Sequence, residues 1–260
     1  MSYVEEYYQT HDEDKRLSSK HGQVEYLTTQ KYIHDYIEEC NGTRILEVGA
    51  GTGRYSVALA KEGFVVTALE LVEHNLDVLR KKLDGTEKID VMQGNALDLS
   101  KFEDNTFDIV LVLGPMYHLY TDNDKLKALT EAVRVTKQGG YILVAYCMNE
   151  KTVLDMAFCQ GLVHEMQEDS CLMADWHLAG NPENLFTMYR TEEIADLDSR
   201  ISARRIKFIA ADGQTAFIKN SIDAMDDKTF EKYMEYHLAT CERQDLIGAS
   251  NHTLDILRKD

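Results

Sequence analysis

Hydrophobic and polar positions form two alternating kinds of pattern in the first half of the chain. Short apolar runs alternate there with segments whose apolar residues recur every three or four positions. Continuous apolar runs are typical of buried parallel strands, and the intervening helices make the crossover connections. The runs are 44–48, 64–71, 88–94, 107–114 and 141–147, and the helical segments are 53–61, 72–83 and 122–137. This alternation predicts βαβ units in a doubly wound sheet.

The flanking parts of the chain have weaker patterns. Residues 1–40, 150–190 and 217–245 have helical spacing or are helix-prone, and residues 204–211 form a sixth apolar run. In residues 251–259, Leu254 and Ile256 alternate with polar neighbours, which predicts a final strand at the edge of the sheet.

Two local signals set expected helix boundaries. Gly139 and Gly140 follow the helical segment that starts at Asp122 and are expected to end it. Thr191 is followed by two glutamates, which suggests a capping-box helix start. The second glutamate arrives one position early for the strict three-residue spacing.

The expected fold class is therefore α/β. We expect a doubly wound Rossmann-like sheet of about seven strands, mostly parallel with an antiparallel edge strand. Right-handed crossovers place helices on both of its faces, and the weaker segments add a helical lid.

The charge of the chain indicates which kinds of partner are disfavoured, and its cysteines indicate the cellular compartment. The 260 residues include 28 basic and 45 acidic side chains, for a net charge of -17, which disfavours nucleic acid and an anionic membrane surface as partners. No apolar run approaches the roughly 20 residues that span a bilayer. The start of the sequence lacks a signal-peptide pattern, and the five cysteines form no CxxC pair, so we expect a cytoplasmic protein.

The sequence EVGAGTG, residues 47–53, lies between the first apolar run and the first helix of the alternation. Gly49 and Gly51 allow a tight turn and a close backbone approach to a ligand. The helix that follows presents unpaired N–H groups and a partial positive charge at its start. The carboxyl end of a strand in such a sheet is also where ligands bind, so this loop predicts a ligand site.

Acidic residues and glycine spacing distinguish this loop from a dinucleotide loop. Its glycines are spaced GxGxG rather than GxGxxG, Glu47 precedes them by two residues, and a second acid, Glu70, ends the second apolar run. An acid at that position hydrogen-bonds ribose hydroxyls. With QGNALDLSKFEDNTFDIVLVLG at residues 93–114, these features resemble class I S-adenosylmethionine-dependent methyltransferases. Within that family, the general likeness is to small-molecule methyltransferases of the quinone-biosynthesis type.

The resemblance covers residues 40–147 and implies S-adenosylmethionine as cofactor. It assigns Glu47 to the amino end, Glu70 to the ribose, and Asn95 with Ala96 to the adenine. Asn95 stands where the family usually has aspartate. The asparagine side chain keeps a carbonyl acceptor but lacks the negative charge. The full implied set is Glu47, Gly49, Ala50, Gly51, Glu70, Leu71, Asn95, Ala96 and Leu113.

The implied activity is methyl transfer to a small organic acceptor, which leaves S-adenosylhomocysteine as the product. Tyr117 and His118 follow the fourth strand, beside the expected transfer point, and are the catalytic candidates. No metal is expected. The acceptor pocket is expected under residues 1–25, 150–190 and 217–245, where the candidate residues are Tyr7, Tyr8, His21, Trp176, His177, Tyr189 and Arg190.

We expect one domain over residues 1–260, because no Pro-rich linker divides the chain. Its parts are N-terminal helices in 1–40, a cofactor-binding half in 41–149, lid insertions in 150–200 and 217–245, and final strands in 201–216 and 246–260. Two alternatives stay open: a non-catalytic S-adenosylmethionine sensor, which needs the same loop, and a NAD-dependent oxidoreductase on a similar sheet.

Overall fold

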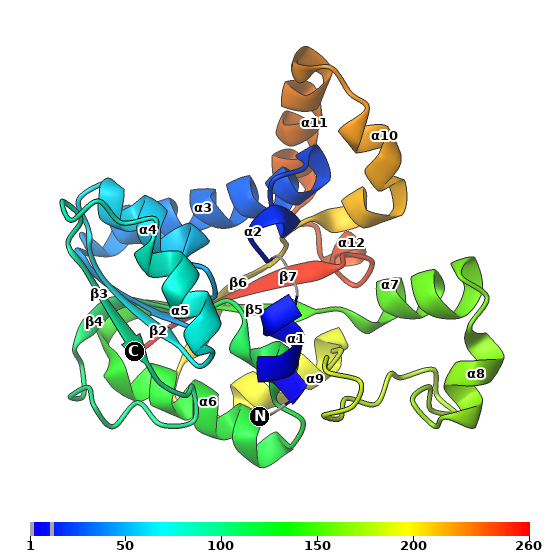
Figure 1. Ribbon diagram of the computed structural model, residues 1–260, viewed down its shortest axis with the longest axis horizontal. Coiled ribbons are helices and arrows are strands. Elements are labelled where there is room, and N and C mark those ends of the chain that lie inside the picture. The colour runs from blue at the N-terminus through cyan, green and yellow to red at the C-terminus, as the bar shows by residue number, and fades with distance from the viewer. Residues whose placement is uncertain (1–2, 11–12) are drawn as a thin grey trace.

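The computed structural model describes residues 3–10 and 13–260. Residues 1–2 and 11–12, which the sequence predicts to be helical, lie outside the described residues. A seven-stranded sheet in the order β3-β2-β1-β4-β5-β7-β6 forms the centre of the molecule (Figure 1). Its strands are β1 (Arg44–Val48), β2 (Val65–Glu70), β3 (Ile89–Gln93), β4 (Phe107–Val112), β5 (Thr136–Cys147), β6 (Arg204–Ala210) and β7 (His252–Arg258).

Strands β1 to β5 pair in parallel, and β7 is antiparallel to both β5 and β6. The predicted mostly parallel, Rossmann-like sheet is therefore confirmed. The order of the strands reverses between β1 and β4, and open α/β sheets bind ligands beyond the carboxyl ends of the strands at such a point.

Helices lie on both faces of the sheet because successive strand residues point to opposite sides. Ile45, Ile109 and Leu143 pack against α3 and α4, whereas the neighbouring residues Leu46 and Val110 pack against α6 and α9. The α-helices are α1 (Tyr3–Thr10), α2 (Glu13–Arg16), α3 (Lys20–Cys40), α4 (Arg54–Lys61), α5 (Glu73–Arg80), α6 (Asp122–Val135), α7 (Asn149–Val153), α8 (Val163–Glu168), α9 (Thr191–Ser199), α10 (Lys219–Asp223), α11 (Asp227–Thr240) and α12 (Gln244–Ile247).

Two segments extend away from the sheet in Figure 1: α7 and α8 on one side, and α10 with α11 on another. A π-helix, η2 (Leu154–Cys159), continues α7, and two short 3₁₀ helices are η1 (Pro115–His118) and η3 (Gly213–Ile218). Residues 169–190, expected to be helix-prone, contain no helix. No helix formed by the described residues has the length and hydrophobicity needed to cross a membrane.

The predicted edge position of the last strand is wrong. β7 lies between β5 and β6, and β6 forms the edge. The polar positions that suggested an exposed face are buried: Asp255 is 0% exposed. Its two oxygens each accept a hydrogen bond from the Arg205 guanidinium at 2.8 Å, and Asp198 lies 2.6 Å from the same group.

The predicted helix end at Gly139 is also wrong, whereas helix α9 begins at Thr191, as its capping-box signal predicts. Helix α6 ends at Val135, and Gly139 and Gly140 lie inside β5, where a Cβ on Gly140 would stand 2.6 Å from the Asp108 carbonyl oxygen. The glycine therefore permits close strand approach at the register shift beside Phe107. Helix α9 has Arg190 as its N-cap, and the Arg190 N–H donates to Glu193, which restores the three-residue spacing of a capping box.

Candidate active site

A cavity of about 550 Å³ opens beyond the carboxyl ends of the parallel strands. Loops after β1, β2, β3 and β4 form one side, and α1, residues 186–188 and the start of β7 close the other. All the residues that the sequence predicts for the cofactor and for catalysis line it: Glu47, Gly49, Ala50, Gly51, Glu70, Leu71, Asn95, Ala96, Leu113, Tyr117 and His118. The volume is within the range of small-molecule sites.

The glycine loop reaches the cavity through left-handed backbone conformations. Gly49 has φ 73° and Gly51 has φ 54°. A Cβ on Gly49 would stand 2.7 Å from the Pro115 ring, so this glycine is required for packing against the loop after β4. A Cβ on Gly51 would meet no atom within 4 Å, so the backbone there borders open space. Gly51 therefore presents bare backbone to a ligand.

Glu70 connects the end of β2 to this loop. One carboxylate oxygen accepts from the Gly51 N–H at 2.8 Å, and the other accepts from the Val72 N–H at 2.9 Å and from the Asn75 amide at 3.4 Å. Burial raises the pKa of Glu70, whereas these hydrogen bonds lower it. Glu70 thus fixes the loop and presents a carboxylate to the cavity.

Glu47, in β1, is only 2% exposed, and its side chain reaches the first turn of α4. One of its oxygens accepts from the Ser56 N–H at 2.9 Å and from the Ser56 hydroxyl, which satisfies an N–H in the first turn of the helix. Burial, with a contribution from the neighbouring Glu70, raises the pKa of Glu47 to about 8 against these hydrogen bonds. We therefore expect the carboxyl group to be mostly protonated at neutral pH in the free protein.

The loop after β3 contributes Asn95 and Ala96 to the lining of the cavity. Asn95 is exposed, and its side-chain oxygen accepts from the Leu97 N–H at 2.9 Å in a local turn. A carbonyl oxygen has two lone pairs, so this oxygen retains capacity for a second donor.

Tyr117 and His118 lie in η1, after β4. Tyr117 is buried, and burial raises its pKa well above the usual range. His118 has partners at both ring nitrogens: Nδ1 is 3.0 Å from the Leu185 carbonyl oxygen and Nε2 is 3.0 Å from the Tyr8 hydroxyl. A carbonyl only accepts, so Nδ1 carries the proton and Nε2 accepts from Tyr8. Burial lowers the pKa of His118, which favours the neutral ring. The hydrogen bond from Tyr8 joins α1 to the rest of the site.

We predict that Tyr8→Phe loosens α1 by about 1 kcal/mol, because it removes the hydrogen bond to His118 while the ring remains. Hydrogen exchange of the α1 amides should become roughly fivefold faster as the helix opens more often. Tyr3→Phe is the matched control, since Tyr3 is on the same helix and is 55% exposed. Equal exchange in both variants would contradict the attachment through His118.

Of the candidate residues predicted for the acceptor pocket, two line the cavity and five do not. Tyr7 and Tyr8 line the cavity, but His21 pairs with Asp223 at 2.7 Å and is not among the lining residues. The remaining four also lie outside the lining set. Trp176 stacks near Phe158, His177 pairs with Glu193, the Tyr189 hydroxyl donates to the Met116 carbonyl, and Arg190 pairs with Glu150. The described lining residues include none from 217–245.

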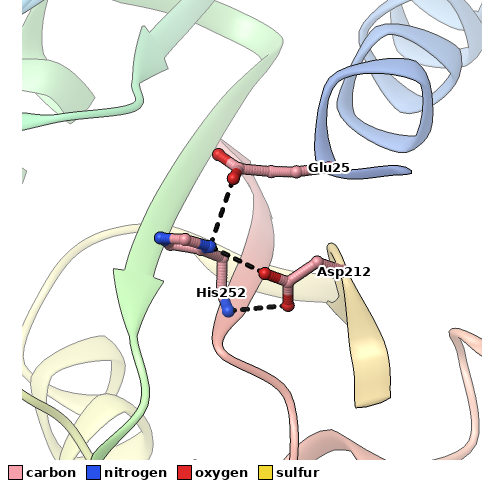
Figure 2. Close-up of side chains that lie close together, drawn as sticks. All are labelled: Glu25, Asp212 and His252. Carbon is pink, nitrogen blue, oxygen red and sulfur yellow. Dashed lines mark hydrogen bonds and ion pairs between the residues drawn. The ribbon is translucent and has the colours of Figure 1, made fainter. Parts of the chain in front are cut away.

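The sequence analysis missed a polar cluster on the cavity wall, formed by Glu25, Asp212 and His252 (Figure 2). His252 lines the cavity beside Tyr117, whose ring centroid lies 6.3 Å away. These residues are far apart in the chain, so no local motif joins them. One signal existed: Asp212 follows β6 and His252 begins β7, and two adjacent antiparallel strands bring these ends to the same edge.

Comparisons with known proteins agree with the fold and with the position of the cavity. Residues 46–144, from β1 to β5, match the family described as "Methyltransferase domain". This segment is similar to a methyltransferase domain, and the strand order and the glycine loop agree with the class I S-adenosylmethionine-dependent enzymes that the sequence resembles. The resemblance predicted from the sequence is therefore confirmed for this part of the chain.

Several curated relatives are similar over the same half. A demethylmenaquinone methyltransferase of Clavibacter sepedonicus is 38% identical over 103 residues, which are 40% of this chain and 40% of the relative. One from Renibacterium salmoninarum is 36% identical over 116 residues, 45% of this chain and 46% of the relative. The chain thus spans less than half the length of the curated relatives it matches.

Solved structures extend the likeness of fold to nearly the whole chain. A Pyrococcus horikoshii protein covers 98% of this chain and 99% of its own, with TM-score 0.61 and 15% identity. A SAM-dependent methyltransferase of Methanosarcina mazei covers 88% of this chain and 96% of its own, with TM-score 0.57 and 16% identity.

Proposed function

We propose that the protein transfers a methyl group from S-adenosylmethionine to a small organic acceptor. The observation that carries this proposal is the meeting of three loops in one cavity. The glycine loop, the Glu70 carboxylate and the 95–96 loop line this cavity together with the buried Tyr117. The match of residues 46–144 to a methyltransferase domain supports this assignment of the loops.

The residues present fit this cofactor. Gly51 leaves open space over bare backbone, Glu70 presents a carboxylate suited to ribose hydroxyls, and Glu47 is a buried acid suited to an ammonium group. The remaining residues proposed to hold the cofactor are Gly49, Ala50, Leu71, Asn95, Ala96 and Leu113.

The bound cofactor supplies a methyl group that its positive sulfur already activates. The chain has to hold the acceptor in line with that group and keep water out, and such positioning supplies about 7–11 kcal/mol of barrier lowering. Tyr117 and the apolar side chains of Tyr7, Phe186 and Met188 form the acceptor side. These side chains suit a flat, largely apolar acceptor, which agrees in kind with relatives named demethylmenaquinone methyltransferase.

Calorimetric titration with S-adenosylmethionine, S-adenosylhomocysteine and NAD tests the cofactor. We expect micromolar binding of the first two and none of NAD. Transfer of labelled methyl from S-adenosylmethionine into a panel of small phenols and quinols then tests catalysis. Binding of NAD alone would favour the oxidoreductase, and cofactor binding with no label transfer to any acceptor would favour the sensor.

We predict that cofactor binding strengthens as the pH rises from 6 to 8. Burial raises the pKa of Glu47 to about 8, so the free protein holds a proton there that an arriving ammonium group displaces. Affinity for S-adenosylhomocysteine should rise by up to about tenfold per pH unit below pH 8 and level off above it, where an α-amino group loses its own charge.

Glu47→Gln provides the control for this pH dependence, because the amide keeps an oxygen for Ser56 and has no proton to lose. Its binding should be weaker and nearly constant between pH 6 and 7.5. Calorimetry in buffers of different ionisation enthalpy should detect the proton released by the native protein. A slope that survives in Glu47→Gln would remove Glu47 from the role.

We also propose a cytoplasmic location, because all five cysteines are unpaired, as expected in a reducing compartment. The net charge of -17 gives no support for nucleic acid as a partner.

A further inference from the structure

We propose that His252 ionises a weakly acidic hydroxyl group of the methyl acceptor and pairs with the resulting oxyanion through Nε2. This inference rests on the proposed methyl transfer and deepens it by naming the acceptor class: a small aromatic compound with a phenol-type hydroxyl. Asp212 acts as a positioning residue for the imidazole ring.

The hydrogen bonds around His252 fix its orientation. Nδ1 lies 2.8 Å from an Asp212 oxygen and 3.2 Å from a Glu25 oxygen, so this nitrogen faces two carboxylates and carries a proton (Figure 2). The other Asp212 oxygen accepts from the backbone N–H of His252 at 2.9 Å and from that of Asn251 at 3.0 Å. One carboxylate therefore holds both the ring and the backbone that carries it.

The second ring nitrogen remains for a ligand. Figure 2 shows Nε2 on the side of the ring away from both carboxylates, and His252 is a lining residue of the cavity. Among the described residues, the Asn251 side-chain nitrogen lies 2.9 Å from Nδ1 and makes only a long contact of 3.4 Å with Nε2. A histidine held at Nδ1 by a carboxylate presents Nε2 to the cavity in a fixed direction, so a proton on Nε2 can be donated to a ligand atom there.

Charges around the ring favour a proton over a metal ion. Glu25 accepts two hydrogen bonds from Arg16, at 2.7 and 3.1 Å, so a guanidinium already neutralises one of the two carboxylates. A proton on the imidazole neutralises the carboxylate of Asp212. A divalent cation would have to displace both positive groups, because His must be neutral to act as a ligand.

The ring is therefore a cation with an apolar cavity in front of it. Burial lowers the pKa of His252, but Glu25, Cys147 and Asp212 outweigh it and raise this pKa well above the usual range. The Tyr117 ring and the Asn251 amide also lie near the imidazole, and Arg16 pairs with Glu25 behind it. An imidazolium Nε2–H in this cavity favours an anionic oxygen, and it suits a phenol, whose ordinary pKa is near 10.

The proposed step balances as follows. On binding, the acceptor O–H bond breaks, its proton passes to water, and the oxyanion accepts a hydrogen bond from Nε2. The oxygen lone pair then forms the bond to the methyl carbon as the carbon–sulfur bond breaks, and that electron pair goes to sulfur. The methylated oxygen is neutral, and His252 keeps its proton.

A phenol that reports its own ionisation tests the proposal without the natural acceptor. 4-Nitrophenol absorbs visible light only as the phenolate, so its spectrum can be titrated against pH in the complex with S-adenosylhomocysteine. We expect the native protein to bind the phenolate and to lower the pKa of bound 4-nitrophenol by at least about one unit, a tenfold preference for the ion.

Two variants separate the roles. His252→Gln should lose the preference. Asp212→Asn keeps an oxygen for the backbone N–H groups but turns an NH₂ toward Nδ1, which forces the ring proton to Nε2 in a neutral ring and should remove most of the preference. Tyr236→Phe, on exposed α11, is the control that should match the native protein.

Titration of the same samples with S-adenosylhomocysteine shows whether each variant is folded and distinguishes the two proposals. Failure of the native protein to bind this compound would overturn the proposed function. Binding of the compound with no 4-nitrophenolate bound, or with an equal preference in His252→Gln, would overturn the role of His252 and leave the proposed function standing.

Discussion

Glu70→Ala is expected to weaken S-adenosylhomocysteine binding by at least about a hundredfold. The carboxylate has two tasks: it would accept the ribose hydroxyls, and it fixes the glycine loop through the Gly51 N–H at 2.8 Å. Each hydrogen bond to a charged group contributes about 1.5–3 kcal/mol, so losing both tasks accounts for this factor. Isothermal calorimetry on the native protein and the variant measures it directly.

Two further variants sharpen this test. Glu73→Ala removes an exposed acid three residues away that pairs with Arg80, and binding should stay within twofold of native. Glu70→Gln keeps one acceptor oxygen, so its affinity should lie between those of native and Glu70→Ala. If Glu70→Ala bound as tightly as Glu73→Ala, the cofactor would have to lie elsewhere in the cavity.

Arg205→Ala is expected to lower the free energy of unfolding by about 3 kcal/mol, because it leaves the buried Asp255 without its guanidinium. Arg204→Ala is the matched control on the same strand. Arg204 pairs with Asp260 where both side chains are more than half exposed, and such pairs contribute about 0–1 kcal/mol. Chemical denaturation of both variants should separate the two arginines clearly.

The effect of Arg205→Ala should also grow with pH. Burial raises the pKa of Asp255 and of Asp198, which share one guanidinium. A carboxyl group with a raised pKa in the folded state adds stability at low pH and loses it as the pH rises through the folded pKa. Without Arg205 these pKa values rise further, so the deficit should be small near pH 4 and largest near pH 8. A deficit independent of pH would contradict this assignment.

The sequence predicts that the glycine loop and Glu70 meet at one cavity, because the signals for them are local. Glu47, Gly49 and Gly51 lie within five residues, and Glu70 ends the strand next to theirs. The cluster of Glu25, Asp212 and His252 could not be predicted in this way. His252 meets Asp212 and Glu25 only after β7 has paired with β6 and α3 has packed beside them, and none of these contacts is encoded by spacing along the chain.

The sequence predicts the parallel half of the sheet, because continuous apolar runs identify buried strands. The pattern misleads at β7, because Asp255 is a polar residue that is buried. Its burial depends on Arg205, which stands fifty residues earlier in the chain. A polar residue in a strand indicates exposure only when no partner of opposite charge lies across the sheet.

The position of β7 between β5 and β6 also sets an order of assembly during synthesis. Strand β6 pairs with β7 alone, yet about forty residues separate the end of β6 from the start of β7. At 5–20 residues per second, a nascent chain waits roughly 2–8 s with β5 and β6 both unpaired on the sides that β7 will join. The glycine loop is translated long before this interval, whereas His252 arrives at its end. A stalled chain would therefore have the glycine loop and two open strand edges that a chaperone could bind, but not the cluster of Glu25, Asp212 and His252.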